Sequence, residues 1–137
     1  MENKDCIFCK IIKDEVPCYK IYEDESCFAF LDIAKDYYGH ILVIPKKHYE
    51  NIFDVPIKEL NIIMKVVQKI SKHLVKNCGF DGVSILNCNG QSAEQSVIHL
   101  HFHIIPRKNG DKLRLCPTRD AQNYNLDEIC NKIKILD

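Results

Sequence analysis

The stretch Gln95-Ser-Val-Ile-His-Leu-His-Phe-His-Ile-Ile-Pro106 places His99, His101 and His103 at every second position, with large apolar residues between them. Successive side chains of a β-strand point to opposite faces of the sheet. We therefore predict a strand that Pro106 ends, with apolar groups on one face. Its other face would carry three imidazoles, each about 7 Å from the next at the usual rise per residue.

Three imidazoles on one surface could attack an electrophile or exchange protons near pH 7. A metal site is the main alternative, because imidazole is the commonest metal ligand in proteins. A chance polar face is the third interpretation. The chain has 6 histidines, an ordinary number, but half of them fall in this one alternating run. That concentration favours chemistry or metal binding over chance.

Length and composition predict one domain spanning residues 1–137, since 137 residues with 46% hydrophobic content can form a sizeable core. Lys+Arg and Asp+Glu both number 19, so the formal net charge is zero, and we expect neither nucleic acid nor a membrane as partner. The polar residues 1–5 predict no secretory signal. Eight cysteines in that context favour free thiols or metal ligands in a reducing cytoplasm over a disulfide scaffold.

Hydrophobic periodicity predicts an α+β chain with a mainly antiparallel sheet, because short turns join its strands. We expect a short helix at 5–13, capped by Asp5. Strands are expected at 19–22, 27–31, 39–45 and 83–86, in addition to the histidine strand.

One long helix is predicted from apolar residues that recur at helical spacing between Ile57 and Leu74. Asp54 is its expected N-cap, Met64 part of its buried stripe, and Gly79 its C-terminal stop. Residues 108–125 look irregular. A final helix is expected at 126–136, with Asn125 as its cap.

Cys6 and Cys9 form a C-x-x-C motif near the N-terminus. A thioredoxin-like redox motif would need a βαβ context, which the pattern lacks. A tetrahedral zinc site needs two further ligands, and His48 and His99 are the candidates. Such a closed site would be structural, clamping the first helix to the sheet and leaving His101 for chemistry. Simple packing of the two cysteines is the alternative.

The run His99-Leu-His-Phe-His-Ile-Ile105 matches the His-φ-His-φ-His-φ-φ signature (φ apolar) of the histidine triad (HIT) family. Three further stretches, at 6–12, 30–33 and 39–48, resemble the same family in order. The resemblance covers about residues 5–107 and leaves 108–137 as a tail. It implies a HIT-like fold: an antiparallel sheet of about five strands with two main helices, extended across a homodimer.

The resemblance also implies an activity, hydrolysis or transfer at the α-phosphate of a purine nucleotide derivative, with release of a nucleoside monophosphate. Nucleoside phosphoramidates and aminoacyl-adenylates are the substrate types implied. Dinucleoside polyphosphate hydrolysis is one alternative, and a zinc-stabilised nucleotide-binding protein with little catalysis is another. The chemistry fits a neutral imidazole, which is a good nucleophile at pH 7 and needs no catalytic metal.

By position, His101 resembles the nucleophile that forms a covalent nucleotidyl-histidine. His103 and Ser96 resemble its phosphate-contacting partners, and His40 the supporting histidine. Asp32 resembles the carboxylate that holds the ribose hydroxyls. The remaining nucleotide-binding positions implied are Ile7, Phe8, Phe30, Ile33, Asn87, Asn89 and Gln95. The zinc site of bacterial-type members, with one structural zinc per chain, is matched by Cys6, Cys9, His48 and His99.

The chain departs from the family pattern at several places. Glu94 stands where the family commonly has glycine, and we expect it to repel an anionic substrate, to point outward, or to alter the loop backbone. Residues 36–38 read Asp-Tyr-Tyr in a loop that usually contains proline. Either Asn87 or Asn89 can fill the place of a ligand-contacting asparagine. The tail after Arg107 does not match the phosphoramidase branch closely, which leaves the leaving group open.

Overall fold

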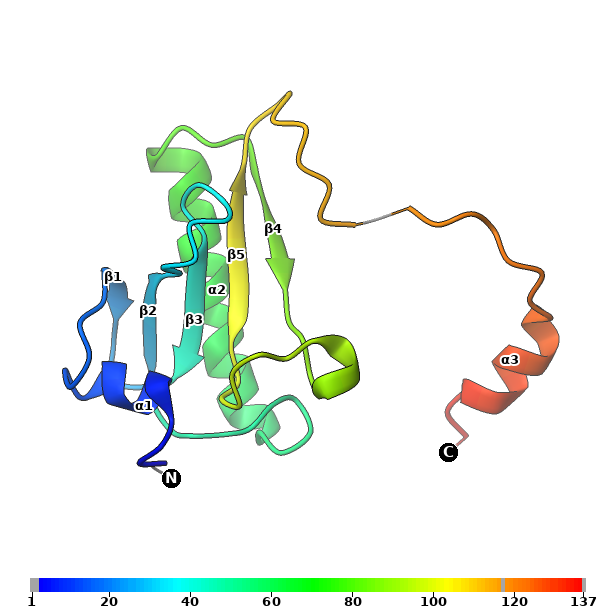
Figure 1. The fold of residues 1–137 in the computed structure, drawn as a ribbon, viewed down its shortest axis with the longest axis horizontal. Coiled ribbons are helices and arrows are strands. Elements are labelled where there is room, and N and C mark those ends of the chain that lie inside the picture. The colour runs from blue at the N-terminus through cyan, green and yellow to red at the C-terminus, as the bar shows by residue number, and fades with distance from the viewer. Residues whose placement is uncertain (1–2, 117, 137) are drawn as a thin grey trace.

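The computed structural model describes residues 3–116 and 118–136. The chain is α+β, as predicted, and its elements are shown in Figure 1. In chain order they are α1 (Ile7–Ile12), β1 (Lys20–Glu23), β2 (Cys27–Leu31), β3 (Ile41–Pro45), α2 (Ile57–Asn77), β4 (Gly82–Leu86), the 3₁₀ turn η1 (Gln91–Ala93), β5 (Phe102–Arg107) and α3 (Leu126–Ile133).

The strands form one 5-stranded sheet in the order β1-β2-β3-β5-β4, and each neighbouring pair is antiparallel. The predicted antiparallel sheet is thus confirmed. In the centre, β3 pairs with β5 so that Leu42 lies opposite His103 and Ile41 lies opposite Ile104. Because β4 pairs only with β5, it forms one edge of the sheet.

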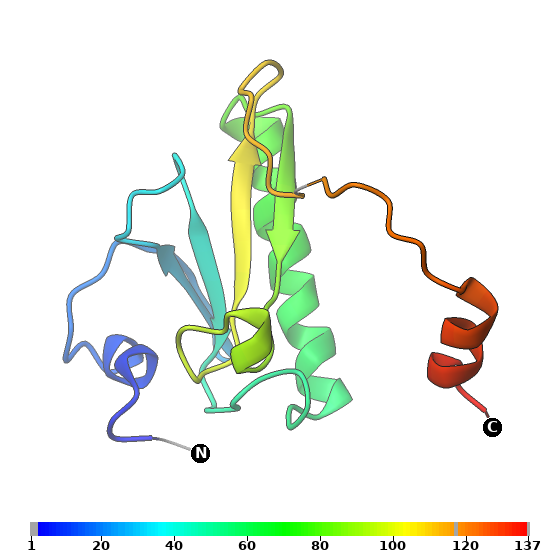
Figure 2. The same ribbon diagram turned by 45° about the vertical axis from the view of Figure 1, so that its right-hand side comes forward.

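The two helices of the main body cover opposite faces of the sheet, α2 one face and α1 the other (Figure 2). The alternating side chains of the strands divide accordingly. The α2 face buries Cys27, Ala29, Ile41, Val43, Leu100, Phe102 and Ile104. The α1 face buries Phe28, Phe30, Leu42 and Ile44. His103 lies opposite Leu42 and therefore belongs to the α1 face.

The histidine strand differs from the prediction at both ends. It begins at Phe102, and the preceding residues are held instead by the loop after β3, where the Leu100 N–H donates to the Tyr49 carbonyl at 2.7 Å. It continues through Pro106 to Arg107. The β3 ladder has already ended at Ile104, and the Arg107 carbonyl accepts from the Asp81 N–H, just before β4. Pro106 therefore turns its missing N–H toward the side without a partner strand.

Helix α2 ends as predicted. Gly79 has φ +79°, and the N–H groups of Cys78 and Phe80 both donate to the Leu74 carbonyl. The predicted N-cap is wrong, because Asp54 accepts from the N–H groups of Glu50 and Asn51 in the preceding turn.

The predicted core stripe of α2 is shifted. Met64 is 40% exposed and Ile57 is 71% exposed, whereas Val66 is buried. The buried positions are Ile63, Val66, Val67, Ile70 and Leu74. Since each residue turns about 100° around a helix, the residue directly after Ile63 lies at the margin of this stripe.

The terminal helices show one wrong and one confirmed cap. Cys6, not Asp5, caps α1, and its sulfur accepts from the Cys9 N–H at 3.4 Å. Asn125 caps α3 by accepting from the Glu128 N–H at 3.2 Å. Helix α3 ends at Ile133 and stands apart from the sheet in both views (Figures 1 and 2). Within 3–116 and 118–136, no helix has the length and apolar character that crossing a membrane requires.

Candidate active site and metal centre

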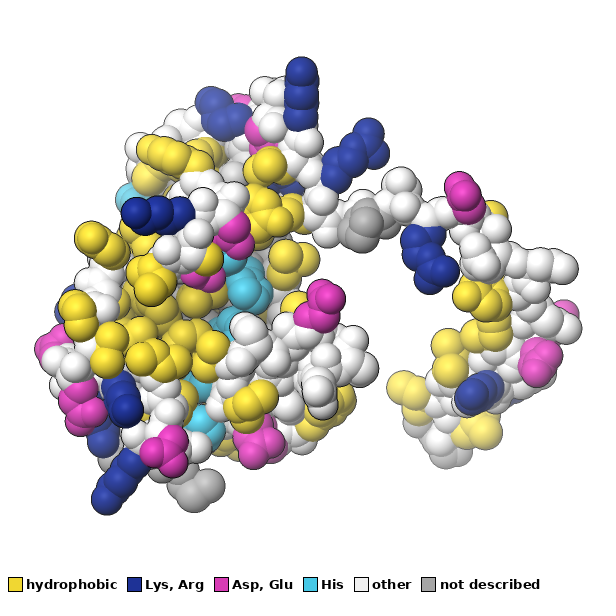
Figure 3. All heavy atoms as spheres, viewed as in Figure 1, with side chains coloured by type: hydrophobic (Ala, Val, Ile, Leu, Met, Phe, Trp, Pro, Cys, Tyr) yellow, Lys and Arg dark blue, Asp and Glu magenta, His cyan; other side chains and the backbone are white. Residues whose placement is uncertain are grey.

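A cavity of about 400 Å³ lies on the α1 face of the sheet. Most of its wall is apolar, and one end is polar. Figure 3 shows the corresponding surface, where histidine side chains lie beside a broad hydrophobic area. The predicted site residues that line the cavity are Ile7, Phe8, Phe30, Asp32, Ile33, Ser96, His101 and His103. The structure therefore brings an apolar pocket and two histidines of the triad together.

His101 is 4% exposed, and its ring is held by the backbone two residues earlier. Its Nδ1 lies 2.7 Å from the carbonyl of His99. A carbonyl only accepts, so Nδ1 carries the hydrogen and Nε2 carries the lone pair. Burial lowers the pKa of His101, which favours the neutral ring. The Phe8 ring packs edge-on against it at 5.3 Å. A neutral imidazole with one fixed tautomer is a competent nucleophile.

His103 is linked to His40 and, through it, to Asp36. His40 Nε2 lies 2.8 Å from His103 Nδ1, and His40 Nδ1 lies 2.8 Å from Asp36 Oδ1. Burial, helped by the neighbouring His101 and His40, lowers the pKa of His103 to about 4. The ring centroids of His101 and His103 are 4.9 Å apart, closer than the sequence predicted, and the rings meet edge to face. Asp36 is a site residue that sequence reasoning missed, although a carboxylate four residues before His40 was visible in the sequence.

Asp32 stands at the polar end of the cavity. Its Oδ1 accepts from the Ala34 N–H at 2.8 Å, which fixes the side chain. Its Oδ2 lies 3.7 Å from His40 Nδ1. One carboxylate oxygen is thus anchored to the backbone, and the other retains its capacity to accept hydrogen bonds from a ligand.

Three other predicted binding residues organise the chain around the site. Gln95 is buried, and its amide nitrogen donates to the carbonyls of Glu50 at 2.7 Å and Val97 at 3.0 Å. Asn87 donates to the His101 carbonyl at 2.9 Å, and Asn89 accepts from a backbone N–H at 2.8 Å. None of the three lines the cavity. Through these bonds they hold the loop between β4 and β5 and the backbone of His101 in place.

Glu94 adopts the left-handed backbone conformation, with φ +65° and ψ +32°. It follows η1, and its side chain is exposed. Glycine adopts this conformation without steric cost, which explains physically why the family commonly has glycine at the position of Glu94. The loop keeps the left-handed turn with glutamate in place.

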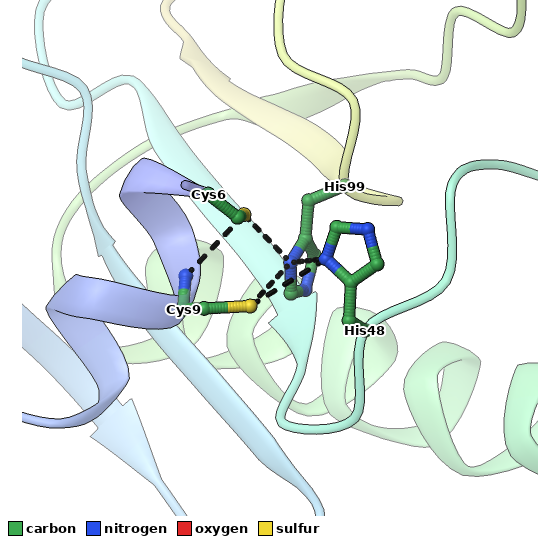
Figure 4. Close-up of side chains that lie close together, drawn as sticks. All are labelled: Cys6, Cys9, His48 and His99. Carbon is green, nitrogen blue, oxygen red and sulfur yellow. Dashed lines mark hydrogen bonds between the residues drawn. The ribbon is translucent and has the colours of Figure 1, made fainter. Parts of the chain in front are cut away.

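The four predicted metal ligands converge between α1, the loop after β3 and the segment before β5 (Figure 4). His99 Nδ1 lies 3.3 Å from Cys6 Sγ, 3.6 Å from Cys9 Sγ and 3.1 Å from His48 Nδ1. In tetrahedral zinc sites, sulfur and nitrogen ligands lie about 3.5 Å apart and two nitrogens about 3.3 Å apart. The cluster therefore matches a Cys₂His₂ metal site in both ligand type and spacing.

The second nitrogen of His99 supports the same conclusion. His99 is completely buried, and its Nε2 donates to the Pro45 carbonyl at 2.9 Å. That bond leaves Nδ1 deprotonated toward the two sulfurs, as a metal ligand requires.

Comparison with known proteins finds relatives along most of the chain. Residues 13–110 match the HIT domain model. The chain is 48% identical over 129 residues to an uncharacterised HIT-like protein of Methanocaldococcus jannaschii, covering 94% of this chain and 98% of that one. It is 40% identical over 124 residues to an adenosine 5'-monophosphoramidase of Saccharomyces cerevisiae, covering 90% and 75%.

Among solved structures, a Zn-bound histidine triad family protein from Mycobacterium smegmatis has a TM-score of 0.76 and 38% identity, and the match covers 81% of each chain. This solved structure shares the fold described above, and the family model and the sequence relatives show the family. The chain belongs to the HIT family.

Proposed function

We propose that the chain is a hydrolase or transferase acting at the α-phosphate of purine nucleotide derivatives, of the nucleoside phosphoramidate or aminoacyl-adenylate type. The observation that carries this proposal is His101, whose Nδ1 is tied to a carbonyl while the ring lines the polar end of an apolar cavity. The similarity to a yeast adenosine 5'-monophosphoramidase supports the substrate class. Nucleoside monophosphate would be the released product.

The cavity suggests how the nucleotide binds. The purine would occupy the apolar part, where Ile7, Phe8, Phe30 and Ile33 line the wall. Asp32 Oδ2 would accept hydrogen bonds from the ribose hydroxyls. The α-phosphate would then lie against His101, His103 and Ser96. Asn87, Asn89 and Gln95 would support this arrangement through the loop backbone.

Two in-line displacements follow from this geometry. First, His101 Nε2 forms a bond to the α-phosphorus while the bond to the leaving group breaks, and the leaving group departs with the electron pair and a proton from His103 Nε2. Bound phosphate raises the pKa of His103, so that Nε2 is protonated before the leaving group departs. Next, water attacks the phosphorus, its proton passes to His103, and the phosphorus–nitrogen bond returns its electrons to His101. Ser96 would donate a hydrogen bond to a non-bridging oxygen.

The cluster of Cys6, Cys9, His48 and His99 would hold one structural zinc ion per chain. Protein ligands would fill all four positions, so the metal would supply folding free energy and no open coordination site. His40 would act behind His103. We further propose a single domain over residues 1–137 in the cytoplasm, and a homodimer that continues the sheet through its open β4 edge.

A rapid-quench mass-spectrometric experiment tests the function. Enzyme is mixed with adenosine 5'-phosphoramidate, quenched within milliseconds and digested, and the peptide carrying His101 is examined for one adenylate. We expect that adduct. Monophosphate release without any adduct on His101 would contradict the covalent mechanism. If folded protein binds the monophosphate but gives neither the adduct nor the release, the chain is a binding protein instead. Repeating the experiment with a dinucleoside polyphosphate decides between the two leaving groups.

A further inference from the structure

The loop between β2 and β3 places a carboxylate behind the histidine pair. Asp36 Oδ1 lies 2.8 Å from His40 Nδ1, and the same oxygen accepts from the Tyr37 N–H at 2.9 Å. The His40 side chain is 5% exposed, whereas that of Asp36 is 45% exposed. A solvated carboxylate is thus fixed against the outer nitrogen of a buried imidazole.

Two carboxylates compete for His40 Nδ1. Asp36 approaches it to 2.8 Å and Asp32 only to 3.7 Å. A single N–H makes one strong hydrogen bond, and here Asp36 receives it. Asp32 Oδ2 therefore remains uncommitted at the polar end of the cavity, where the ribose hydroxyls are proposed to bind.

The hydrogen bond between His40 Nδ1 and Asp36 sets the direction of the hydrogen bond between His40 and His103. A carboxylate only accepts, so His40 Nδ1 carries the hydrogen, and Nε2 of the neutral ring accepts. His103 Nδ1 must then be the donor in the 2.8 Å contact. This leaves His103 Nε2 as the ring nitrogen that exchanges protons with a bound substrate.

We propose that Asp36 is a positioning residue for the reaction, which fixes the hydrogen-bond direction from His103 through His40 and leaves Asp32 to the ribose. This inference rests on the proposed function. When His103 Nε2 gains a proton, the chain His103–His40–Asp36 keeps both hydrogen bonds and ends on a negative charge. The carboxylate thus stabilises the protonated form that donates to the leaving group.

The charges around His40 and His103 agree with the positioning role of Asp36. Partial burial acts to raise the pKa of Asp36, but its hydrogen bond and charge interaction with His40 prevail and lower it. Burial lowers the pKa of His103, whereas Asp32 and Asp36 oppose that shift. The other titratable groups facing the pair are His101, beside His103, and Tyr37, whose ring lies 5.7 Å from His40.

The experiment compares Asp36→Ala and Asp36→Asn with wild type in the zinc-loaded protein, using adenosine 5'-phosphoramidate between pH 5 and 9. Asp36→Ala should lower kcat by about 10-fold or more and raise KM, because Asp32 becomes the acceptor for His40. Asp36→Asn retains an oxygen acceptor and should recover most of kcat. Lacking the charge, it should move the basic limb of the kcat profile down by about half a pH unit or more. Asp120→Ala, an exposed carboxylate in the tail, is the matched control.

Imidazole ¹⁵N spectra of the same variants give a readout that does not depend on turnover. His40 should be protonated at Nδ1 in wild type and in Asp36→Asn, and its Nδ1 signal should shift in Asp36→Ala, where Asp32 replaces Asp36 as the acceptor. Unchanged spectra and unchanged kinetics in Asp36→Ala would overturn the inference. Equal losses in both variants without movement of the pH profile would also overturn it, by showing a merely structural role. Wild type without turnover but with the expected spectra would instead overturn the proposed function alone.

Discussion

His99 and His101 stand two residues apart, yet opposite ring nitrogens tie them to the protein. His99 donates Nε2 to the Pro45 carbonyl and turns Nδ1 toward the cysteines. His101 donates Nδ1 to the His99 carbonyl, which leaves Nε2 for chemistry. The same side chain thus suits the proposed metal ligand in one place and the proposed nucleophile in the other. Which carbonyl each ring reaches decides between the two roles.

Removing the nucleophile should give the largest effect. We expect His101→Ala to lower kcat for adenosine 5'-phosphoramidate by about 10³-fold or more, since neighbouring donors cannot replace the attacking nitrogen. Zinc content should not change, because the metal cluster does not include this ring. Steady-state kinetics and metal analysis check both parts. His73→Ala, at an exposed histidine on α2, is the control, and wild-type kcat in His101→Ala would refute the assignment.

Breaking the metal cluster should affect stability more than chemistry. Cys9→Ser should abolish the one-to-one zinc content and lower the free energy of unfolding by about 3 kcal/mol or more, as loss of a structural zinc site does. Metal analysis and denaturant unfolding measure the two effects. Cys78→Ser, at the exposed cysteine after α2, should retain both properties. The zinc proposal would be ruled out if the wild-type protein contained no zinc and Cys9→Ser left its free energy of unfolding unchanged.

Acid should destabilise the fold through the reactive histidines. Burial lowers the pKa of His103 from the ordinary histidine value of 6.5 to about 4, so the unfolded chain binds more protons between these values. Stability is then full above about pH 6.5 and is lost as the pH falls toward 4. The contribution of His103 to this loss should be about 2 kcal/mol. Urea unfolding at pH 6.5 and 4.5 should therefore show a smaller difference for His103→Asn than for wild type, and equal differences would contradict the shift.

The smallest effect concerns the backbone at Glu94, in the loop between β4 and β5. Glu94→Gly should raise the free energy of unfolding by about 1 kcal/mol, because glycine adopts its left-handed conformation without strain. Glu94→Gln removes the charge but keeps the side chain, so it should leave stability unchanged. An increase of kcat/KM in Glu94→Gln would show that the carboxylate repels substrate. No stability gain in Glu94→Gly would show that the backbone there is unstrained.

Patterns with a fixed period were the part of this molecule that could be predicted from sequence. Alternation placed His103 on the face of β5 opposite Phe102 and Ile104, although His99 and His101 lie before the strand. Residue type identified the four residues that converge in the Cys₂His₂ cluster. The wrong predictions concern contacts between distant segments. The start of β5 depends on the hydrogen bond from Leu100 to Tyr49, and the N-terminal turn of α2 on Asp54 accepting from the preceding turn. Spacing along the chain does not record such contacts.

The same limit applies to the site itself. The choice of ring nitrogen in His99 depends on a carbonyl 54 residues earlier in the chain. The bond from His40 to Asp36 depends on the path of an exposed loop. Both are set by local backbone geometry after the sheet has formed, so residue type alone could not specify them.

The pairing of Leu42 with His103 also constrains how the gene can change. A deletion of one codon between His99 and Ile104 would turn the later side chains to the opposite face, so that His103 would enter the α2 core and Phe102 or Ile104 would face the nucleotide. Single-codon insertions would have the same consequence. Base substitutions in this stretch remove one contact at a time, whereas any odd change in its length exchanges the two faces. Residues 111–116 and 118–125 contain neither helix nor strand and so carry no such register.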